Sequence, residues 1–149
     1  MKRDYPNRPF VAVGVVIWQG DRVLLTRRAK PPRAGAWSIP GGAQHIGETI
    51  FETAHREVME ETGLLIKNLQ LIDVIDLIDR DEENQIRHHY TLIDLQAEYS
   101  SGSIKPGDDC TDARWVRPDE MENYDLWHET TSMIRLAATK RPMSKCKSG

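Results

Sequence analysis

Apolar residues gather in short runs along the chain, and these runs predict two β-hairpins. Phe10 to Trp18 (FVAVGVVIW) is rich in β-branched and aromatic residues, and Arg22 to Arg27 (RVLLTR) follows after a three-residue turn. Leu69 to Ile78 is apolar on both alternating faces, and beyond the charged turn at 80–85 residues 86–99 carry apolar side chains on one face. Each pair of runs therefore predicts a hairpin.

Helical spacing is clearest between the two hairpins, from Glu48 to Thr62. Apolar residues recur there among strong helix formers at every third or fourth position, namely Phe51, Ala54 and Val58. Gly63 follows as a C-terminal stop. A second helix is expected over Asp125 to Thr139, where five positions have the same periodicity: Leu126, Thr130, Met133, Ile134 and Ala137.

Prolines, glycines and polar residues mark the connections between these elements. Two prolines place residues 30–35 (KPPRAG) in a loop, and Trp37 to Ile39 is expected to be a brief strand. We expect Pro40-Gly41-Gly42 to break regular structure. Residues 100–109 are polar and predict a loop, after which Ala113 to Val116 predicts the last strand.

Length and composition are typical of one globular domain. The chain has 149 residues, of which 39% are hydrophobic and 29% charged. We expect the domain to span residues 1–140, followed by a disordered tail at 141–149. The apolar run at 10–18 is too short for a secretory signal or a membrane-spanning helix. Two cysteines, Cys110 and Cys146, are too few for a disulfide framework, which indicates a reducing cytoplasm.

The charge balance narrows the choice of partners. Twenty Lys and Arg stand against 23 Asp and Glu, for a net charge of -3. Nothing in that balance favours a polyanion or an anionic membrane surface, so no nucleic-acid or membrane partner is expected. The sequence leaves open whether the protein forms a homodimer.

Three glutamates in the first helix point to metal chemistry. Glu57, Glu60 and Glu61 are spaced by three and four residues, which places them within about a 100° arc of one helix. Two carboxylates about 4 Å apart repel by roughly 4 kcal/mol at an effective dielectric near 20, and a divalent cation would reverse that sign. Ligands that are all oxygen favour Mg²⁺ or Mn²⁺. Gly41 and Gly42 just upstream allow the backbone to approach an ion or a phosphate closely.

The same segment resembles a known family motif. Residues 42–64 read GAQHIGETIFETAHREVMEETGL and fill every specified position of the Nudix box, G-x5-E-x7-R-E-U-x-E-E-x-G-U, in which U is aliphatic. A chance match has a probability on the order of one in 10⁸ per starting point. The flanking order of hairpin, WSIPGG loop, helix, hairpin and helix is also similar to the whole Nudix domain.

The resemblance implies an α+β fold, an α/β/α sandwich around a central mixed β-sheet, and metal-dependent pyrophosphohydrolase activity. It implies metal ligands at Glu57, Glu60 and Glu61 and at the carbonyl of Gly41. Arg56 orients these glutamates, so Glu57, Glu60 and Arg56 form the expected catalytic set. Glu48 is expected near the helix start, on the side away from Glu57, where it would favour the positive end of the helix dipole.

The proton acceptor and the substrate contacts follow less directly from the motif. Glu57 is the first candidate for the base, and four further acids are alternatives: Glu98, Asp108, Asp109 and Asp112. Related MutT-type enzymes carry an extra acidic metal ligand where Asp109 stands. Arg28, Gly42 and Trp37 are expected to contact a small nucleotide substrate.

Substrate identity is suggested by the segments outside the box. RPFVAVGVVIW and RRAKPPRAGAWSIPGG resemble bacterial ADP-ribose pyrophosphatase-type members, which release AMP and ribose 5-phosphate. Many ADP-ribose enzymes have a proline about sixteen residues beyond the box, whereas this chain has Arg80. A MutT-like nucleoside triphosphate pyrophosphohydrolase is therefore the first alternative. A nucleotide-sensing Nudix domain without activity is the second. The roles of His88 and His89 stay open.

Overall fold

The computed structural model of the chain describes residues 3–29, 34–105 and 110–141. Within these residues seven strands form one sheet: β1 (Phe10–Gln19), β2 (Arg22–Arg28), β3 (Trp37–Ser38), β4 (Gly41–Ala43), β5 (Leu65–Arg80), β6 (Ile86–Ser101) and β7 (Cys110–Val116). The helices are α1 (Ile50–Thr62), the 3-10 helix η1 (Pro118–Tyr124) and α2 (His128–Lys140). Both predicted hairpins are present, as β1–β2 and β5–β6.

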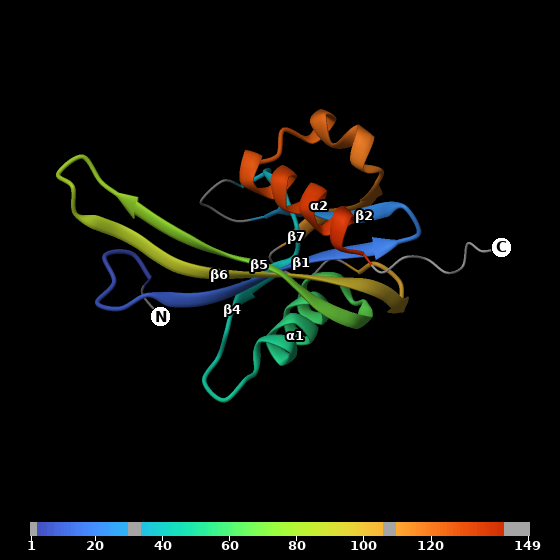
Figure 1. Cartoon of the computed structure of the whole chain (residues 1–149), viewed down its shortest axis with the longest axis horizontal. Helices are drawn as coiled ribbons and strands as arrows, with labels where there is room; N and C mark the ends of the chain where they lie inside the picture. The colour runs from blue at the N-terminus through green and yellow to red at the C-terminus, as the bar shows by residue number, and fades with distance from the viewer. Residues whose placement is uncertain (1–2, 30–33, 106–109, 142–149) are drawn as a thin grey trace.

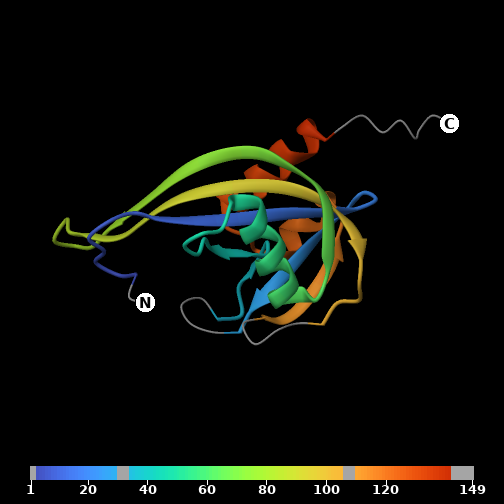
Figure 2. The ribbon, with the colours of Figure 1, turned by 90° about the horizontal axis from the view of Figure 1, so that it is seen from below.

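The sheet is mixed, with the strand order β3-β2-β1-β6-β5. β1 and β6 run parallel, while β5 and β6 are antiparallel. α1 covers one face of the sheet and α2 covers the other, as Figure 1 shows, and Figure 2 shows α1 in front of the curved sheet. The expected α+β class, with three α/β/α layers around a mixed sheet, is confirmed.

β1 changes its partner along its length. Its start pairs with β4, with Gly14 opposite Gly41, and its end pairs with β2, with Trp18 opposite Val23. The expectation that Pro40-Gly41-Gly42 breaks regular structure was therefore wrong for Gly41 and Gly42. A Cβ on Gly41 would collide with the Val13 carbonyl oxygen, so glycine is what allows β4 to lie this close to β1.

Alternate side chains of β1 supply the core on both faces of the sheet. Val15 is buried on the α1 side with Ala54 and Val58. Val16 is buried on the α2 side, where it belongs to the cluster formed by Trp18, Val23, Leu25, Ile72, Val116, Met121, Met133, Ile134 and Ala137. A continuous apolar run in β1 thus indicates a strand that is covered by a helix on each face.

Local hydrogen bonds fix the ends of α1. The Thr49 side chain accepts from the Glu52 amide at 3.1 Å, and Glu52 accepts from the Thr49 amide at 2.8 Å, so α1 begins at Ile50 rather than Glu48. Gly63 adopts φ 78° and ends the helix as predicted. Phe51, which was expected on the buried face, is 42% exposed because Thr53 and Ala54 face the core instead.

The C-terminal region differs from the prediction at its start. η1 precedes α2, and Asp125 adopts the left-handed conformation with φ 50°, so α2 begins at His128 rather than Asp125. The expected tail at 141–149 lies outside the described residues except for Arg141. None of the helices in the described ranges is long and apolar enough to span a membrane.

Candidate active site

Arg56 is the centre of the polar network on α1. Its guanidinium donates to Glu48 at 2.6 and 3.0 Å, to Glu57 Oε2 at 2.9 Å and to Glu60 Oε1 at 3.3 Å. A further bond, of 2.9 Å, reaches the carbonyl oxygen of Ala43 and ties α1 to β4. The hydrogen bond to Glu48, and after it the hydrogen bond and charge of Glu57, raise the pKa of Arg56 above its usual value, while burial acts in the opposite direction. The single guanidinium of Arg56 therefore holds the carboxylates of Glu48, Glu57 and Glu60 in place and links them to β4.

Glu48 lies beside Glu57 in space, since both accept from Arg56. The expectation that Glu48 points away from Glu57 was wrong. The loop before α1 turns Glu48 back, because its carboxylate also accepts from the His45 amide at 2.9 Å and from the Thr53 hydroxyl at 2.9 Å. The bond to Arg56 is the main reason that the pKa of Glu48 falls to about 2, with the His45 amide as the next contribution.

Glu48→Gln should therefore cost stability in a manner that depends on pH. The pKa is lower in the folded state than its ordinary 4.5, so the ionised carboxylate stabilises the fold above about pH 4.5 and loses that effect as the pH falls toward 2. Urea unfolding of both proteins at several pH values should show a gap in unfolding free energy that narrows over this interval. A gap of constant size between pH 6 and pH 2.5 would contradict this role.

Gly42 and Glu57 are in direct contact. A Cβ on Gly42 would overlap the Glu57 carboxyl group and lie 2.6 Å from its Oε1. The Glu57 side chain is mostly buried, and one side of it packs against β4 at Gly42. The glycine predicted as a substrate contact is thus also the residue that makes room for the central carboxylate.

A cavity of about 360 Å³ opens in front of this carboxylate. Glu57 and Glu61 line it together with Gly41 and Gly42, and Arg27 and Arg28 line it from β2. The pairing with β7 shifts register between the two arginines, and such a bulge can turn consecutive side chains toward one side. The cavity therefore combines acidic residues of α1 with basic residues of β2.

The residues of this cavity fit a hard divalent cation. Mg²⁺ is commonly held by one or two carboxylates together with waters and substrate phosphates. Glu57 and Glu61 supply two carboxylates, and Gly41 brings backbone oxygen to the same cavity. Over residues 3–29, 34–105 and 110–141, no three His, Cys, Asp or Glu side chains stand close enough to form a complete site. The remaining ligands would then come from substrate and water.

Glu60 lies outside this cavity. Its side chain is 57% exposed and pairs with Arg56, so it faces solvent while Glu57 and Glu61 face the cavity. The three glutamates occupy one arc of the helix, as predicted, but only two of them line the cavity.

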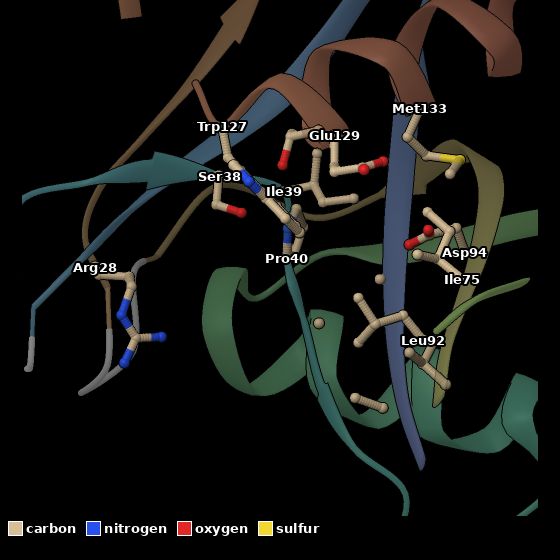
Figure 3. Close-up of a pocket in the computed structure, with 15 residues that line it drawn as sticks. Arg28, Ser38, Ile39, Pro40, Ile75, Leu92, Asp94, Trp127, Glu129 and Met133 are labelled. Carbon is tan, nitrogen blue, oxygen red and sulfur yellow. The ribbon is translucent and has the colours of Figure 1, made fainter. Parts of the chain in front are cut away.

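A second cavity, of about 250 Å³, adjoins the first (Figure 3). The two share four lining residues: Arg28, Ser38, Ile39 and Gly41. Beyond them the second cavity extends under α2, with Leu92, Ile75 and Met133 as apolar walls. Asp94, Trp127 and Glu129 also line it, and sequence reasoning missed them as a group because they come from distant parts of the chain.

The other candidates lie apart from these cavities or outside the description. Trp37 lines neither cavity. Its ring packs edge-on against the ring of Tyr124, and the two ring centroids are 5.2 Å apart.

Two of the alternative acids are engaged in local contacts. Glu98 accepts a hydrogen bond from Asn68, and Asp112 accepts hydrogen bonds from the Ala113 amide and from Arg114. His88 pairs with Asp79 on the β5–β6 hairpin. Asp108 and Asp109 lie outside the described residues.

The comparisons with known proteins agree with this architecture. A match to the NUDIX domain covers residues 8–137. The chain is 34% identical to the ADP-ribose pyrophosphatase of Methanocaldococcus jannaschii over 121 residues, which are 81% of this chain and 69% of that protein. It is also 34% identical over 110 residues to the NAD-capped RNA hydrolase NudC of Pseudomonas syringae pv. syringae, covering 72% of this chain but only 36% of NudC.

Solved structures show the same fold. The crystal structure of a MutT NUDIX hydrolase from Burkholderia pseudomallei matches with a TM-score of 0.76 and 27% identity, covering 87% of this chain and 98% of that one. Together, the domain match and the archaeal relative show that the chain belongs to the Nudix family, and they confirm the pyrophosphohydrolase class predicted from its box.

Proposed function

We propose that this protein hydrolyses the pyrophosphate bond of a nucleoside diphosphate linked to another group, with an ADP-ribose-like compound as the favoured substrate. The observation that carries this proposal is the cavity in which Glu57 and Glu61 share the lining with Arg27 and Arg28. Hydrolysis of a pyrophosphate requires cations that neutralise its negative charge and a carboxylate close to the attacking water. Both occur in this one cavity.

Each part of the cavity has a role in the proposed reaction. Arg27 and Arg28 bind phosphate oxygens and hold the pyrophosphate against β4. Glu57 Oε2 is engaged by Arg56, and Glu57 Oε1 is the atom proposed to take the proton of the attacking water. Arg56 orients Glu57 without touching substrate. A bound divalent cation supplies charge neutralisation and makes water more acidic.

Nudix hydrolases generally depend on a divalent metal, and Mg²⁺ is the one proposed here, with Mn²⁺ as a substitute. Glu57 and Glu61 would hold it, with the Gly41 carbonyl as a further ligand. Glu60 stays a proposed ligand on the basis of the box alone, since its side chain faces solvent here. The oxygen-only donor set supports a hard cation over zinc. Asp109 stays a proposed extra ligand from the sequence alone.

Removal of the metal should abolish turnover reversibly. Treatment with a chelator is expected to reduce ADP-ribose hydrolysis to background, and added Mg²⁺ should restore it, because two bare carboxylates facing a pyrophosphate repel it. Phosphate release coupled to a phosphatase measures this. Full activity after exhaustive chelation would rule out the metal-dependent mechanism.

ADP-ribose is favoured because the relative from M. jannaschii bears the name ADP-ribose pyrophosphatase and aligns over most of both chains. A panel of ADP-ribose, sugar nucleotides, NADH and nucleoside triphosphates, including oxidised ones, should show the highest kcat/KM for ADP-ribose. The expected products are AMP and ribose 5-phosphate, separated by ion-pair chromatography. Turnover of triphosphates alone would contradict this preference.

A MutT-like triphosphate pyrophosphohydrolase is the alternative that a specific observation favours, since a MutT structure matches at 27% identity over nearly its whole length.

Location and partners are proposed from the composition. The chain has only two cysteines, which supports action in a reducing cytoplasm. No nucleic-acid partner is proposed, and self-association into a homodimer would be measured by sedimentation.

A further inference from the structure

Asp94 is a buried carboxyl group at the middle of the sheet that the proposed hydrolysis does not use. It lies on β6 opposite Gly14 of β1 and is 8% exposed. A Cβ on Gly14 would lie 2.8 Å from Asp94 Oδ1, so this glycine gives the carboxyl group its space. Asp94 also lines the cavity of about 250 Å³ under α2.

This carboxyl group has acidic neighbours rather than partners. In the part of the chain that the structure describes, no hydrogen bond or salt bridge reaches Asp94. The charged groups that act on it are Asp73, opposite it on β5, and Glu129 of α2. Burial first, and then these two acids, raise the pKa of Asp94 to about 6.

A carboxyl group with so little exposure and no protein partner is costly. Its oxygens are not sealed off inside the protein and Asp94 lines the cavity, so a molecule in the cavity can reach and satisfy them. Figure 3 shows the Asp94 and Glu129 side chains close to β1 beneath α2. Glu129 has a partner in His128, whose Nε2 is 3.7 Å from its carboxylate, whereas Asp94 lacks one among the described residues. Asp94 is thus a buried acceptor that a molecule in this cavity can reach.

The remaining walls suit a flat aromatic ring. Leu92, Ile75 and Met133 are apolar, and the Trp127 ring lines the cavity at the start of α2. Nucleobases are commonly read by stacking against aromatic or apolar side chains, with hydrogen bonds to the ring edge. The cavity also adjoins the proposed pyrophosphate site through Arg28 and Gly41, which is where a nucleoside must lie.

We propose that Asp94 is a specificity-determining residue that accepts a hydrogen bond from the exocyclic amine of the substrate's nucleobase. The inference rests on the proposed function for the identity of the base, since ADP-ribose carries adenine with an amine at position 6. A base without that amine leaves the carboxyl group buried and unsatisfied. Such losses are large when the site is built around the missing donor.

The test compares two nucleotides that differ only in that amine, AMP and purine riboside 5′-monophosphate, by calorimetric titration in Mg²⁺. The wild-type protein should bind AMP about 10- to 100-fold more tightly. Asp94→Leu should reduce the ratio to near one by weakening AMP binding. Asp94→Asn retains an acceptor oxygen and should keep most of the preference.

Asp73→Asn is the matched control, because it removes an acidic neighbour of Asp94 without removing the acceptor. It should leave the AMP preference intact. Thermal melting checks the fold, and Asp94→Leu is expected to be at least as stable as wild type at neutral pH, since it removes an unpaired buried charge.

Several results would overturn the inference: equal affinity of the wild type for both nucleotides, no AMP binding, or an unchanged preference in Asp94→Leu. A loss of preference in Asp73→Asn equal to that in Asp94→Leu would also overturn it. A failure of the proposed function can be distinguished from a failure of this inference. If ADP-ribose is not hydrolysed while AMP is still preferred through Asp94, the reaction is wrong and the base contact stands.

Discussion

Glu57→Gln should lower kcat for ADP-ribose by about 10²- to 10⁴-fold while the protein stays folded. The substitution removes the negative charge and the proton acceptor at the carboxyl group that faces the cavity. Glutamine keeps the shape and retains an oxygen that can accept from Arg56, so little destabilisation is expected. Steady-state kinetics and circular dichroism measure the two quantities separately.

The matched control is Glu52→Gln on the same helix. Among the described residues Glu52 makes the cap contacts with Thr49, and glutamine can fill the same position of a capping box, so activity should be unchanged. If Glu57→Gln retains more than half of wild-type kcat, Glu57 is neither base nor metal ligand. A nucleotide-sensing domain without activity would show no turnover in the wild type either.

Arg56→Lys should have the second largest effect, and it should lower both the free energy of unfolding and the rate of turnover. Lysine keeps the charge but cannot reproduce a planar fork that donates to Glu48, Glu57 and the Ala43 carbonyl together. Losing charge-assisted bonds from a side chain that is largely buried is expected to cost about 1–3 kcal/mol of unfolding free energy. Residues that orient catalytic or metal-binding groups typically contribute about 10- to 100-fold to activity.

Arg87→Lys provides the control for Arg56→Lys. Arg87 pairs with Asp79 at 2.9 Å on the β5–β6 hairpin, where both side chains are substantially exposed. Exposed pairs contribute about 0–1 kcal/mol, so this variant should behave like wild type in urea unfolding and in kinetics. Equal effects of the two substitutions would mean that Arg56 has no special part in orienting Glu57.

The sequence predicted the parts of this site that are close together along the chain. The spacing of Arg56, Glu57 and Glu61 places them on one side of α1, and Gly63 ends that helix because glycine adopts the left-handed conformation at no steric cost. Local periodicity and the box are sufficient for these features. Their surroundings are set by the neighbouring strands.

Features that depend on distant contacts were missed. The turn before α1 brings Glu48 onto Arg56, and close pairing with β1 makes a strand of Gly41–Ala43. Asp94 and Glu129 line the same cavity only because β6 lies inside the sheet, between β1 and β5, and α2 covers that face. No spacing along the chain encodes these approaches. A lone aspartate inside an apolar strand was the signal that could have drawn attention to Asp94.

The central claim is that Glu57 and Glu61 hold a divalent cation against the pyrophosphate of a nucleotide. Anomalous diffraction from crystals containing Mn²⁺ and a non-hydrolysable methylene analogue of ADP-ribose tests it most directly. We expect a manganese peak within about 2.0–2.5 Å of carboxylate oxygens of Glu57 or Glu61 and of a phosphonate oxygen. Bound analogue with no manganese at these glutamates would contradict it.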